Sequence, residues 1–192
     1  AVRWLSKFGS SIKRININIG YLCAMRFDII SAVPGLLEGL LGYSIPKRGC
    51  DKGLAEIHIH NLHDYVIGKY KQIDDTPFGG GAVMVLMPEP LSVVIEKLKS
   101  ERKYDQVIYL TPDGRPLKQG LANQLSLGEN LMLICGHYKG IDHRVRDLYV
   151  TMEISLGDFV LSGGEIAAAA VVDSVIRLLP GVLGDEESAL SD

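Results

Sequence analysis

The chain has 192 residues, of which 47% are hydrophobic and 22% are charged, and its formal net charge is −3. This length suits one domain, and the composition allows a buried globular core. No apolar run reaches the roughly 18 residues that a membrane-spanning helix needs. Three widely spaced cysteines without a C-x-x-C pair indicate reduced thiols, not a disulfide framework or a zinc site.

The charge is unevenly distributed along the chain. Residues 1–24 carry four basic residues and no acidic one, whereas residues 25–192 carry 16 basic and 23 acidic residues. This acidic body argues mildly against broad binding to a phosphate backbone. We interpret residues 1–24 as an N-terminal extension that precedes a start at Met25. A targeting peptide is the alternative, although Asn16 and Asn18 interrupt its apolar region.

From Met25 onward, predicted strands and helices alternate. Apolar or alternating runs predict strands, and apolar residues spaced by three and four predict helices. The predicted strands are residues 26–31, 54–60, 82–87, 106–110, 130–135 and 152–156. The predicted helices are residues 34–42, 88–101, 117–126, 143–150 (a short helix or turn) and 165–179. Near-continuous apolar strands that alternate with helices predict an α/β fold whose parallel sheet is covered on both faces.

Three glycine-bearing loops follow predicted strands, at residues 111–116, 136–142 and 156–165. Ligands of open α/β sheets bind at the C-terminal ends of the strands, and glycine lets the backbone approach a ligand closely. One such loop is explained by a tight turn, whereas three in succession predict a shared small-molecule site. The chain has no G-x-G-x-x-G, so an ordinary dinucleotide site is not predicted.

Two further motifs have open interpretations. "TPFGGG" at residues 76–81 lacks the Gly-Lys-Ser/Thr of a P-loop, so it is a lid, a backbone cradle or a flexible linker. His58, His60 and His63 have a spacing that allows a metal, but no carboxylate or cysteine completes the ligand set. We therefore favour solvent-facing polar histidines and predict no metal site.

Two charged residues near the C-terminus also allow two interpretations each. Arg177 lies four residues after Asp173 and forms either a surface ion pair or a cation that faces an anionic group of a ligand. Asp192 ends an acidic stretch that is either a solvated linker or the source of a general base.

Six segments occur in one order: "IDDTPFGGG", "VIYLTPDG", "LICGHYKGID", "ISLGDFVLSGGE", "DSVIRLLPGVLG" and "SALSD". With this set the chain resembles the bacterial tRNA (guanine-N(1))-methyltransferases of the SPOUT class over residues 25–192. "GDFVLSGGE" followed by "PGVLG" is the most specific pair. The resemblance implies methyl transfer from S-adenosylmethionine to N(1) of guanine 37 of tRNA. It also implies an α/β SPOUT fold with a C-terminal trefoil knot, and a cytoplasmic homodimer that has no membrane segment.

The resemblance also implies roles for individual residues. Asp192 would be the general base and Arg177 would stabilise negative charge on the 6-oxo group of guanine. The implied cofactor-binding residues are Thr111, Pro112, Gly136, Tyr138, Gly140, Leu156, Gly157, Asp158, Phe159, Val160, Leu161 and Gly163. The implied substrate-binding residues are Asp75, Pro77, Phe78, Gly79 and Gly80. The need for Mg²⁺ stays open.

Three features differ from the family pattern. Lys139 stands where the family often has Glu, and Val83 and Ala167 stand where Gly and Pro are common. We expect residues 25–184 to form the methyltransferase domain and residues 185–192 to begin a linker, without the family's basic C-terminal domain. Cofactor binding with poor tRNA binding and weak turnover is then expected. The alternatives are a SPOUT methyltransferase that acts on another RNA, and a non-catalytic ligand-binding or dimerisation module.

Overall fold

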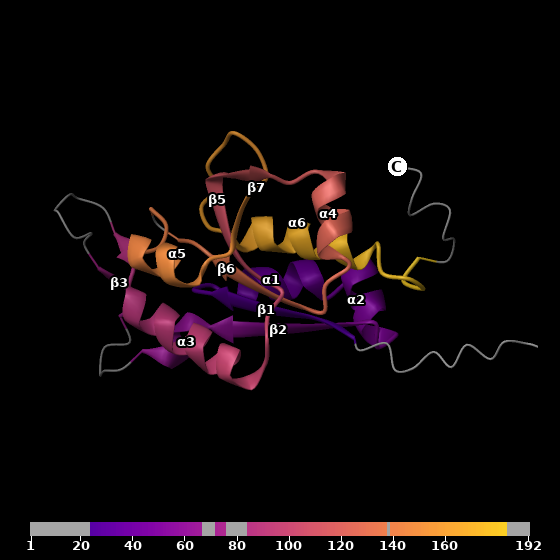
Figure 1. Cartoon of the computed structure of the whole chain (residues 1–192), viewed down its shortest axis with the longest axis horizontal. Coiled ribbons are helices and arrows are strands. Elements are labelled where there is room, and N and C mark those ends of the chain that lie inside the picture. The colour runs from indigo at the N-terminus through magenta and orange to yellow at the C-terminus, as the bar shows by residue number, and fades with distance from the viewer. Residues whose placement is uncertain (1–23, 67–71, 76–83, 138, 184–192) are drawn as a thin grey trace, which may run out of the picture.

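The computed structural model describes residues 24–66, 72–75, 84–137 and 139–183. Its centre is a five-stranded sheet with the order β2-β1-β6-β5-β7, and every neighbouring pair of strands is parallel (Figure 1). The strands are β1 (Met25–Ser31), β2 (Ala55–Asn61), β5 (Gln106–Pro116), β6 (Asn130–Cys135) and β7 (Met152–Ser155). The predicted α/β fold with a parallel sheet is thus confirmed, whereas the trefoil knot stays a prediction from the resemblance.

Helices cover both faces of this sheet, as the apolar strands predicted. One face packs against α1 (Gly35–Leu41), α2 (Ser44–Asp51), α4 (Gln119–Leu125) and α6 (Glu165–Ile176). The other face packs against the 3₁₀ helix η1 (Leu62–Tyr65), α3 (Pro88–Glu101) and α5 (His143–Tyr149). Figure 1 shows α6 and α3 on opposite sides of the strands. Within the described residues, no helix is long and apolar enough to cross a membrane.

Side chains that alternate along β1 divide between the two cores. Phe27 and Ile29 are fully buried against the α6 side, and Ile30 is buried against the α3 side. This alternation follows from the period of two in a strand. Both faces of β1 are therefore removed from water, which places this strand at the centre of the fold.

Asp28 is the exception in β1, because its charged side chain is also fully buried. Arg26 donates two hydrogen bonds to its carboxylate, at 2.8 and 2.9 Å, and Tyr104 and His60 each contribute one at 2.7 Å. Burial alone would raise the pKa of Asp28, but these hydrogen bonds outweigh it and hold that pKa well below its usual range. His60 is thus a partner of a buried carboxylate and not a solvent-facing polar residue.

Three predicted elements differ from the structure. A turn was predicted at residues 111–116, but these residues belong to β5, because the strand pairs with β7 again after a bulge. Of the predicted strand 82–87, residues 84–87 are described, and within them Val85–Leu86 (β4) is a short strand that pairs, antiparallel, with Asp74–Asp75 (β3). The predicted helix 165–179 ends earlier, since Leu178 and Leu179 donate to carbonyls three residues back in a tightened last turn. The sequence analysis also missed α2.

Candidate active site

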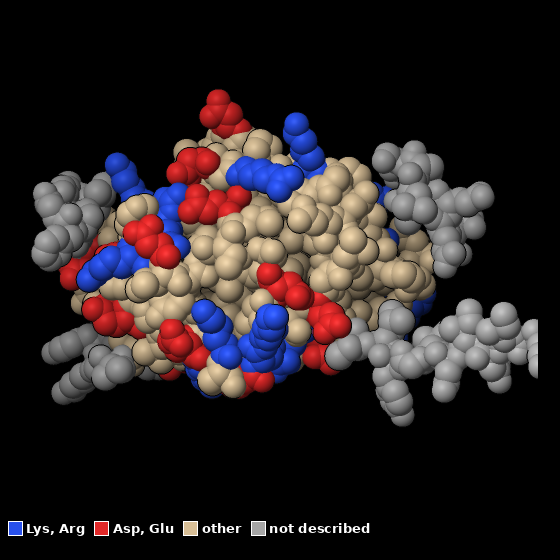
Figure 2. Space-filling view, viewed as in Figure 1, with Lys and Arg blue, Asp and Glu red and all other residues tan. Residues whose placement is uncertain are grey.

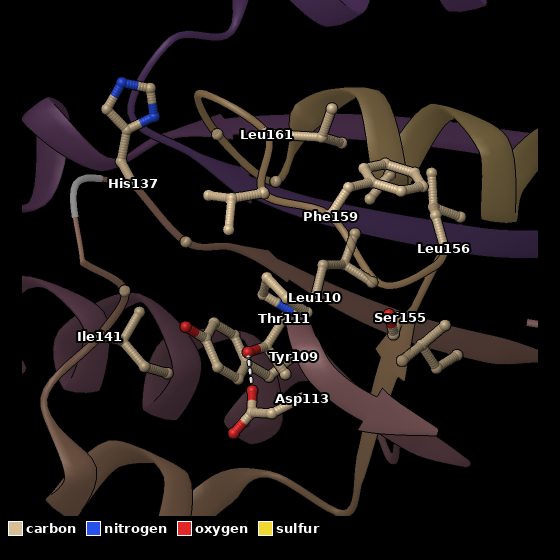
Figure 3. Close-up of a pocket in the computed structure, with 18 of the residues that line it drawn as sticks. Tyr109, Leu110, Thr111, Asp113, His137, Ile141, Ser155, Leu156, Phe159 and Leu161 are labelled. Atoms are coloured by element: carbon tan, nitrogen blue, oxygen red, sulfur yellow. Dashed lines mark hydrogen bonds between the residues drawn. The ribbon is translucent and has the colours of Figure 1, made fainter. Parts of the chain in front are cut away.

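The C-terminal ends of β5, β6 and β7 open into a cavity of about 490 Å³ (Figure 3). All three predicted glycine-bearing segments line it, so their predicted convergence on one cavity is confirmed, whereas a small-molecule ligand stays a prediction. The wall combines apolar side chains with backbone. Its apolar lining includes Leu110, Ile141, Ile154, Leu156, Phe159, Val160 and Leu161. Its charged or titratable lining consists of Tyr109, Asp113, His137, Lys139 and Arg146.

Tyr109 forms the wall between two of the loops. Its ring is only 4% exposed, and burial raises the pKa of its hydroxyl group. A Cβ at Gly136 would lie 3.0 Å from the Tyr109 hydroxyl oxygen, and a Cβ at Gly140 would lie 2.6 Å from it. Gly140 also has φ of 105°, a conformation that side chains rarely adopt. The loop after β6 therefore takes this path only with glycine beside Tyr109.

The loop before α6 packs directly on the end of β6. The Gly164 amide donates to the carbonyl of Gly136 at 2.8 Å, and a Cβ at Gly164 would lie 2.8 Å from the Cα of Cys135. His137 and Gly163 form an isolated bridge in the same place. The backbone of two distant loops thus meets at the cavity.

The loop after β7 begins with a side-chain turn at Ser155. The Ser155 hydroxyl group accepts from the amide of Gly157 at 3.1 Å and donates to its carbonyl at 3.0 Å. Beyond this turn, Phe159 is 53% exposed and Val160 is 83% exposed although both line the cavity. Large apolar side chains of the cavity lining are therefore exposed to solvent, as far as the described residues go.

A buried carboxylate lies beneath these loops, at the start of α6. Glu165 is 1% exposed and accepts a hydrogen bond of 2.7 Å from Ser31, at the end of β1. Its second oxygen lies 3.8 Å from Nδ1 of His137, which lines the cavity. Glu165 thereby connects β1, the loop after β6 and α6.

Comparison with known proteins agrees with this arrangement. The family model described as tRNA (Guanine-1)-methyltransferase TrmD matches residues 25–192. Relatives named tRNA (guanine-N(1)-)-methyltransferase include one from Christiangramia forsetii, 60% identical over 88% of this chain and 74% of the relative. Another from Bacteroides thetaiotaomicron is 56% identical over 88% of this chain and 75% of the relative. The chain belongs to the tRNA (guanine-1)-methyltransferase family.

A solved structure supports the fold of this family. The crystal structure of tRNA (m1G37) methyltransferase from Aquifex aeolicus aligns with a TM-score of 0.78 and 41% sequence identity. The alignment covers 84% of this chain and 73% of that chain. The predicted recognition and the predicted SPOUT-class α/β fold are thereby confirmed.

The structure brings together most residues that the family resemblance assigned to the cofactor. Those that line the cavity are Thr111, Pro112, Gly136, Gly140, Leu156, Gly157, Phe159, Val160, Leu161 and Gly163. Asp158 is not among the lining residues, although both its neighbours are. Tyr138 lies outside the described residues. The contact roles themselves stay predictions.

The predicted catalytic and substrate-binding residues are not gathered at this cavity. Arg177 is the C-cap of α6, and the helix of 12 residues separates it from Gly164 by about 18 Å. Asp75 lies in β3 and does not line the cavity. The others, Asp192, Pro77, Phe78, Gly79 and Gly80, lie outside the described residues.

Several residues of the site were missed by the sequence analysis. Tyr109, Asp113, His137 and Arg146 line the cavity, and Glu165 supports it. No local signal marks Arg146 or Glu165, since the partners of both side chains lie on other elements of the fold. Among the residues that the structure describes, no group of three or more His, Cys, Asp and Glu could hold a metal ion.

Proposed function

We propose that this protein transfers a methyl group from S-adenosylmethionine to N(1) of guanine in tRNA, at position 37. The single observation that carries the proposal is the match of the guanine-1 methyltransferase family to residues 25–192, with the family's predicted cofactor residues gathered at one cavity. The position follows the relative from Aquifex aeolicus, which is described as acting at m1G37. A tRNA substrate also favours a cytoplasmic protein.

The cavity suits this cofactor in size and chemistry. Its volume of about 490 Å³ lies within the roughly 300–1,000 Å³ of typical small-molecule sites. The exposed backbone of the glycine loops offers hydrogen-bonding groups to an adenine ring, and Leu156 and Leu161 offer apolar surface to it. When bound, S-adenosylmethionine supplies an electrophilic methyl group on a sulfonium.

Asp192 and Arg177 would supply the remaining chemistry. Guanine N(1) carries a weakly acidic proton and must lose it before its lone pair can attack the methyl carbon. The Asp192 carboxylate would take that proton, and a general base of this kind contributes about 10²–10⁴ in rate. The Arg177 guanidinium would stabilise the negative charge that gathers on the 6-oxo group. Asp75, Pro77, Phe78, Gly79 and Gly80 would hold the guanine.

A homodimer would reconcile these roles with the geometry. Arg177 lies about 15 Å along α6 from Ala167, the lining residue of its own chain's cavity that is nearest to it on this helix, so one chain does not bring the two together. Leu36 and Leu40 on α1 are 48% and 51% exposed, and Ile166 in the first turn of α6 is 48% exposed. An area without Lys, Arg, Asp or Glu extends over α6 in Figure 2. We infer that a second copy covers this apolar surface and supplies its Arg177 to the cavity.

Binding and methyl transfer test the proposal in sequence. Calorimetry measures the affinity of the chain for S-adenosylmethionine. Single-turnover methyl transfer is then compared between tRNA with guanine 37, the same tRNA with adenine 37, and ribosomal RNA. We expect transfer only to the first RNA, and parallel reactions with and without EDTA test the need for Mg²⁺. Binding without transfer to any RNA would favour a non-catalytic module, and preference for ribosomal RNA would overturn the tRNA assignment.

Mixing of two inactive variants tests the shared site. Arg177→Ala removes the proposed cation, and Gly140→Val blocks the cavity beside Tyr109. If Arg177 acts on the partner's cavity, a mixed dimer contains one intact site, and mixing restores activity. A mixture that exchanges subunits and stays inactive would show that each site is built from one chain.

A further inference from the structure

Arg146 on α5 connects three parts of the cavity wall that come from different segments of the chain. Its Nε donates to Oε1 of Glu153 on β7 at 2.8 Å, and its Nη2 donates to Oε2 of the same carboxylate at 2.7 Å. Nη2 also donates to Oδ2 of Asp113 at 3.2 Å. The guanidinium carbon lies 5.3 Å from the centre of the Tyr109 ring. One side chain therefore links α5, β7 and two places on β5.

The contact with Asp113 holds the bulge of β5. Leu110 and Arg115 both pair with Ile154 of β7, so residues 111–114 are displaced from the ladder between these two positions. Thr111, Pro112 and Asp113 line the cavity, and Thr111 donates a hydrogen bond to Asp113, as the dashed line in Figure 3 shows. The Thr111 and Arg146 hydrogen bonds lower the pKa of Asp113. The bulge is thus a part of the wall that lacks ladder hydrogen bonds to β7 and is tied instead through Asp113.

The contact with Tyr109 supports the opposite wall. The Tyr109 hydroxyl oxygen packs against Gly136 and Gly140, so the position of this ring sets the position of the loop after β6. A guanidinium over an aromatic face gains about 0.5–1 kcal/mol at exposed sites and more when it is shielded from water. Arg146 is 24% exposed, and its two-point pairing with Glu153 fixes the plane of the guanidinium. The hydrogen bonds that Arg146 donates to Glu153 raise the pKa of Arg146.

We propose that Arg146 is a positioning residue for the cofactor, which sets the spacing between the 111–114 bulge and the Tyr109 wall. This inference rests on the proposed function, since it takes S-adenosylmethionine as the ligand of the cavity. Arg146 acts through Asp113 and Tyr109, and its two hydrogen bonds to Glu153 fix its position. Lysine at this position would keep the charge, but it has no planar fork for Glu153 and Asp113 together.

The experiment compares ligand binding by variants of α5 and β5 that break or keep the contact between Arg146 and Asp113. Arg146→Gln removes the link, Asp113→Asn weakens only its contact with the bulge, and the double variant completes a cycle. Arg144→Gln is the matched control, because Arg144 lies two residues away, pairs with Asp142 at 2.8 and 2.9 Å and does not line the cavity. Calorimetry with S-adenosylmethionine and S-adenosylhomocysteine gives the affinities, and thermal unfolding gives the stability of each variant.

We expect Arg146→Gln to weaken binding of both ligands by about 10-fold, which is below the roughly 10²-fold that a misplacement of 1 Å can cost. Asp113→Asn should weaken binding less, and the double variant should bind no worse than Arg146→Gln, because both changes break one linkage. In methyl transfer, KM for S-adenosylmethionine should rise while kcat at saturation is retained. A loss of stability alone would not raise KM while it leaves kcat unchanged.

The outcomes separate this inference from the proposed function. If the unaltered chain binds neither ligand, the proposed function falls and the inference falls with it. If the unaltered chain binds and Arg146→Gln binds equally well, only the positioning role is overturned. Equal weakening by Arg144→Gln would also overturn it, since that change leaves the linkage intact. If Arg146→Gln does not fold, Asp113→Asn decides alone: unchanged affinity in that variant refutes the tie between Arg146 and the bulge.

Discussion

Gly140→Ala is predicted to damage the cofactor cavity and the fold together. At φ of 105° an alanine is strained, and its Cβ would lie 2.6 Å from the hydroxyl oxygen of Tyr109, which is almost fully buried. Backbone strain of this kind costs about 1–3 kcal/mol, and overpacking a buried site costs a further 1–3 kcal/mol. We therefore expect urea unfolding to show a loss of about 2–5 kcal/mol.

The affinity for S-adenosylmethionine should fall as well, because Tyr109 can avoid the added Cβ only if its ring moves within the cavity wall. Calorimetry with S-adenosylmethionine measures this effect on the folded variant. Gly120→Ala is the control, since no atom lies within 4 Å of its added Cβ in the first turn of α4. A glycine-to-alanine change at a compatible position stabilises by about 0.4–1 kcal/mol. If Gly140→Ala is as stable and binds as well as Gly120→Ala, the close packing of Tyr109 on this loop is refuted.

Three further changes test other parts of the molecule. Asp28→Asn should destabilise the fold by about 3 kcal/mol at pH 7 in urea unfolding, because it breaks a buried hydrogen-bonded ion pair. The pKa of Asp28 is lowered by folding, so this difference should be complete above the unfolded pKa of about 3.9 and shrink as the pH falls below it; a difference independent of pH down to 2 would contradict the assignment. Glu165→Gln retains an acceptor for Ser31 but removes the charge beside His137, so methyl transfer should lose rate while unfolding in urea changes by less than about 1 kcal/mol. Asp192→Ala should lower the single-turnover rate by about 10²–10⁴ with unchanged affinity for S-adenosylmethionine, and an unchanged rate would remove Asp192 from the chemistry.

The parts of the fold that follow from local patterns were predicted from the sequence. Helix α3 was predicted at residues 88–101, its observed bounds, because Leu91, Val94, Ile95 and Leu98 form one apolar stripe and are all buried. Strand β6 was predicted at residues 130–135 with the same success, since an apolar run in the centre of a parallel sheet is buried on both faces. Both predictions depend on neighbours within the same element.

Features that depend on distant partners were not predicted. Pro112 and the Asp113–Gly114 pair are typical of a turn, but the register with Ile154 of β7 turns this segment into a bulge within a strand. The strand predicted at residues 82–87 is shorter among the described residues, because Val85–Leu86 pairs with the short β3 and not with the main sheet. His60 was taken as solvent-facing, although Asp28 lies 32 residues earlier and is 2.7 Å from its ring. In each case the deciding contact joins residues far apart in the chain.

The same distinction applies to the site. The glycines that predicted it lie next to strand ends, where the local pattern is informative, whereas Arg146 and Glu165 act across several segments. Arg146 joins α5, β5 and β7, and Glu165 joins α6, β1 and the loop after β6. Glu165 is buried and Arg146 is 24% exposed, so their contacts are at least partly shielded from bulk water, and an electrostatic contact in such surroundings is stronger and more costly to break. On the proposed function, the glycine loops would supply the surface that faces the ligand, and these two charged groups would set how far apart those loops stand.

The two ends of helix α6 hold different parts of the proposed catalytic machinery. Its first turn carries Glu165, which supports the cavity of its own chain, and Ala167, which lines that cavity, and Arg177 follows the last residue of the helix about 15 Å from Ala167. The helix between them is apolar and fully packed at Ala168, Val172 and Val175, so it cannot bend to close that distance. If Arg177 takes part in catalysis, the cavity that it serves therefore belongs to another copy of the chain. Dimerisation would then be a requirement of the chemistry, and dilution below the dimer dissociation constant should abolish methyl transfer while cofactor binding persists.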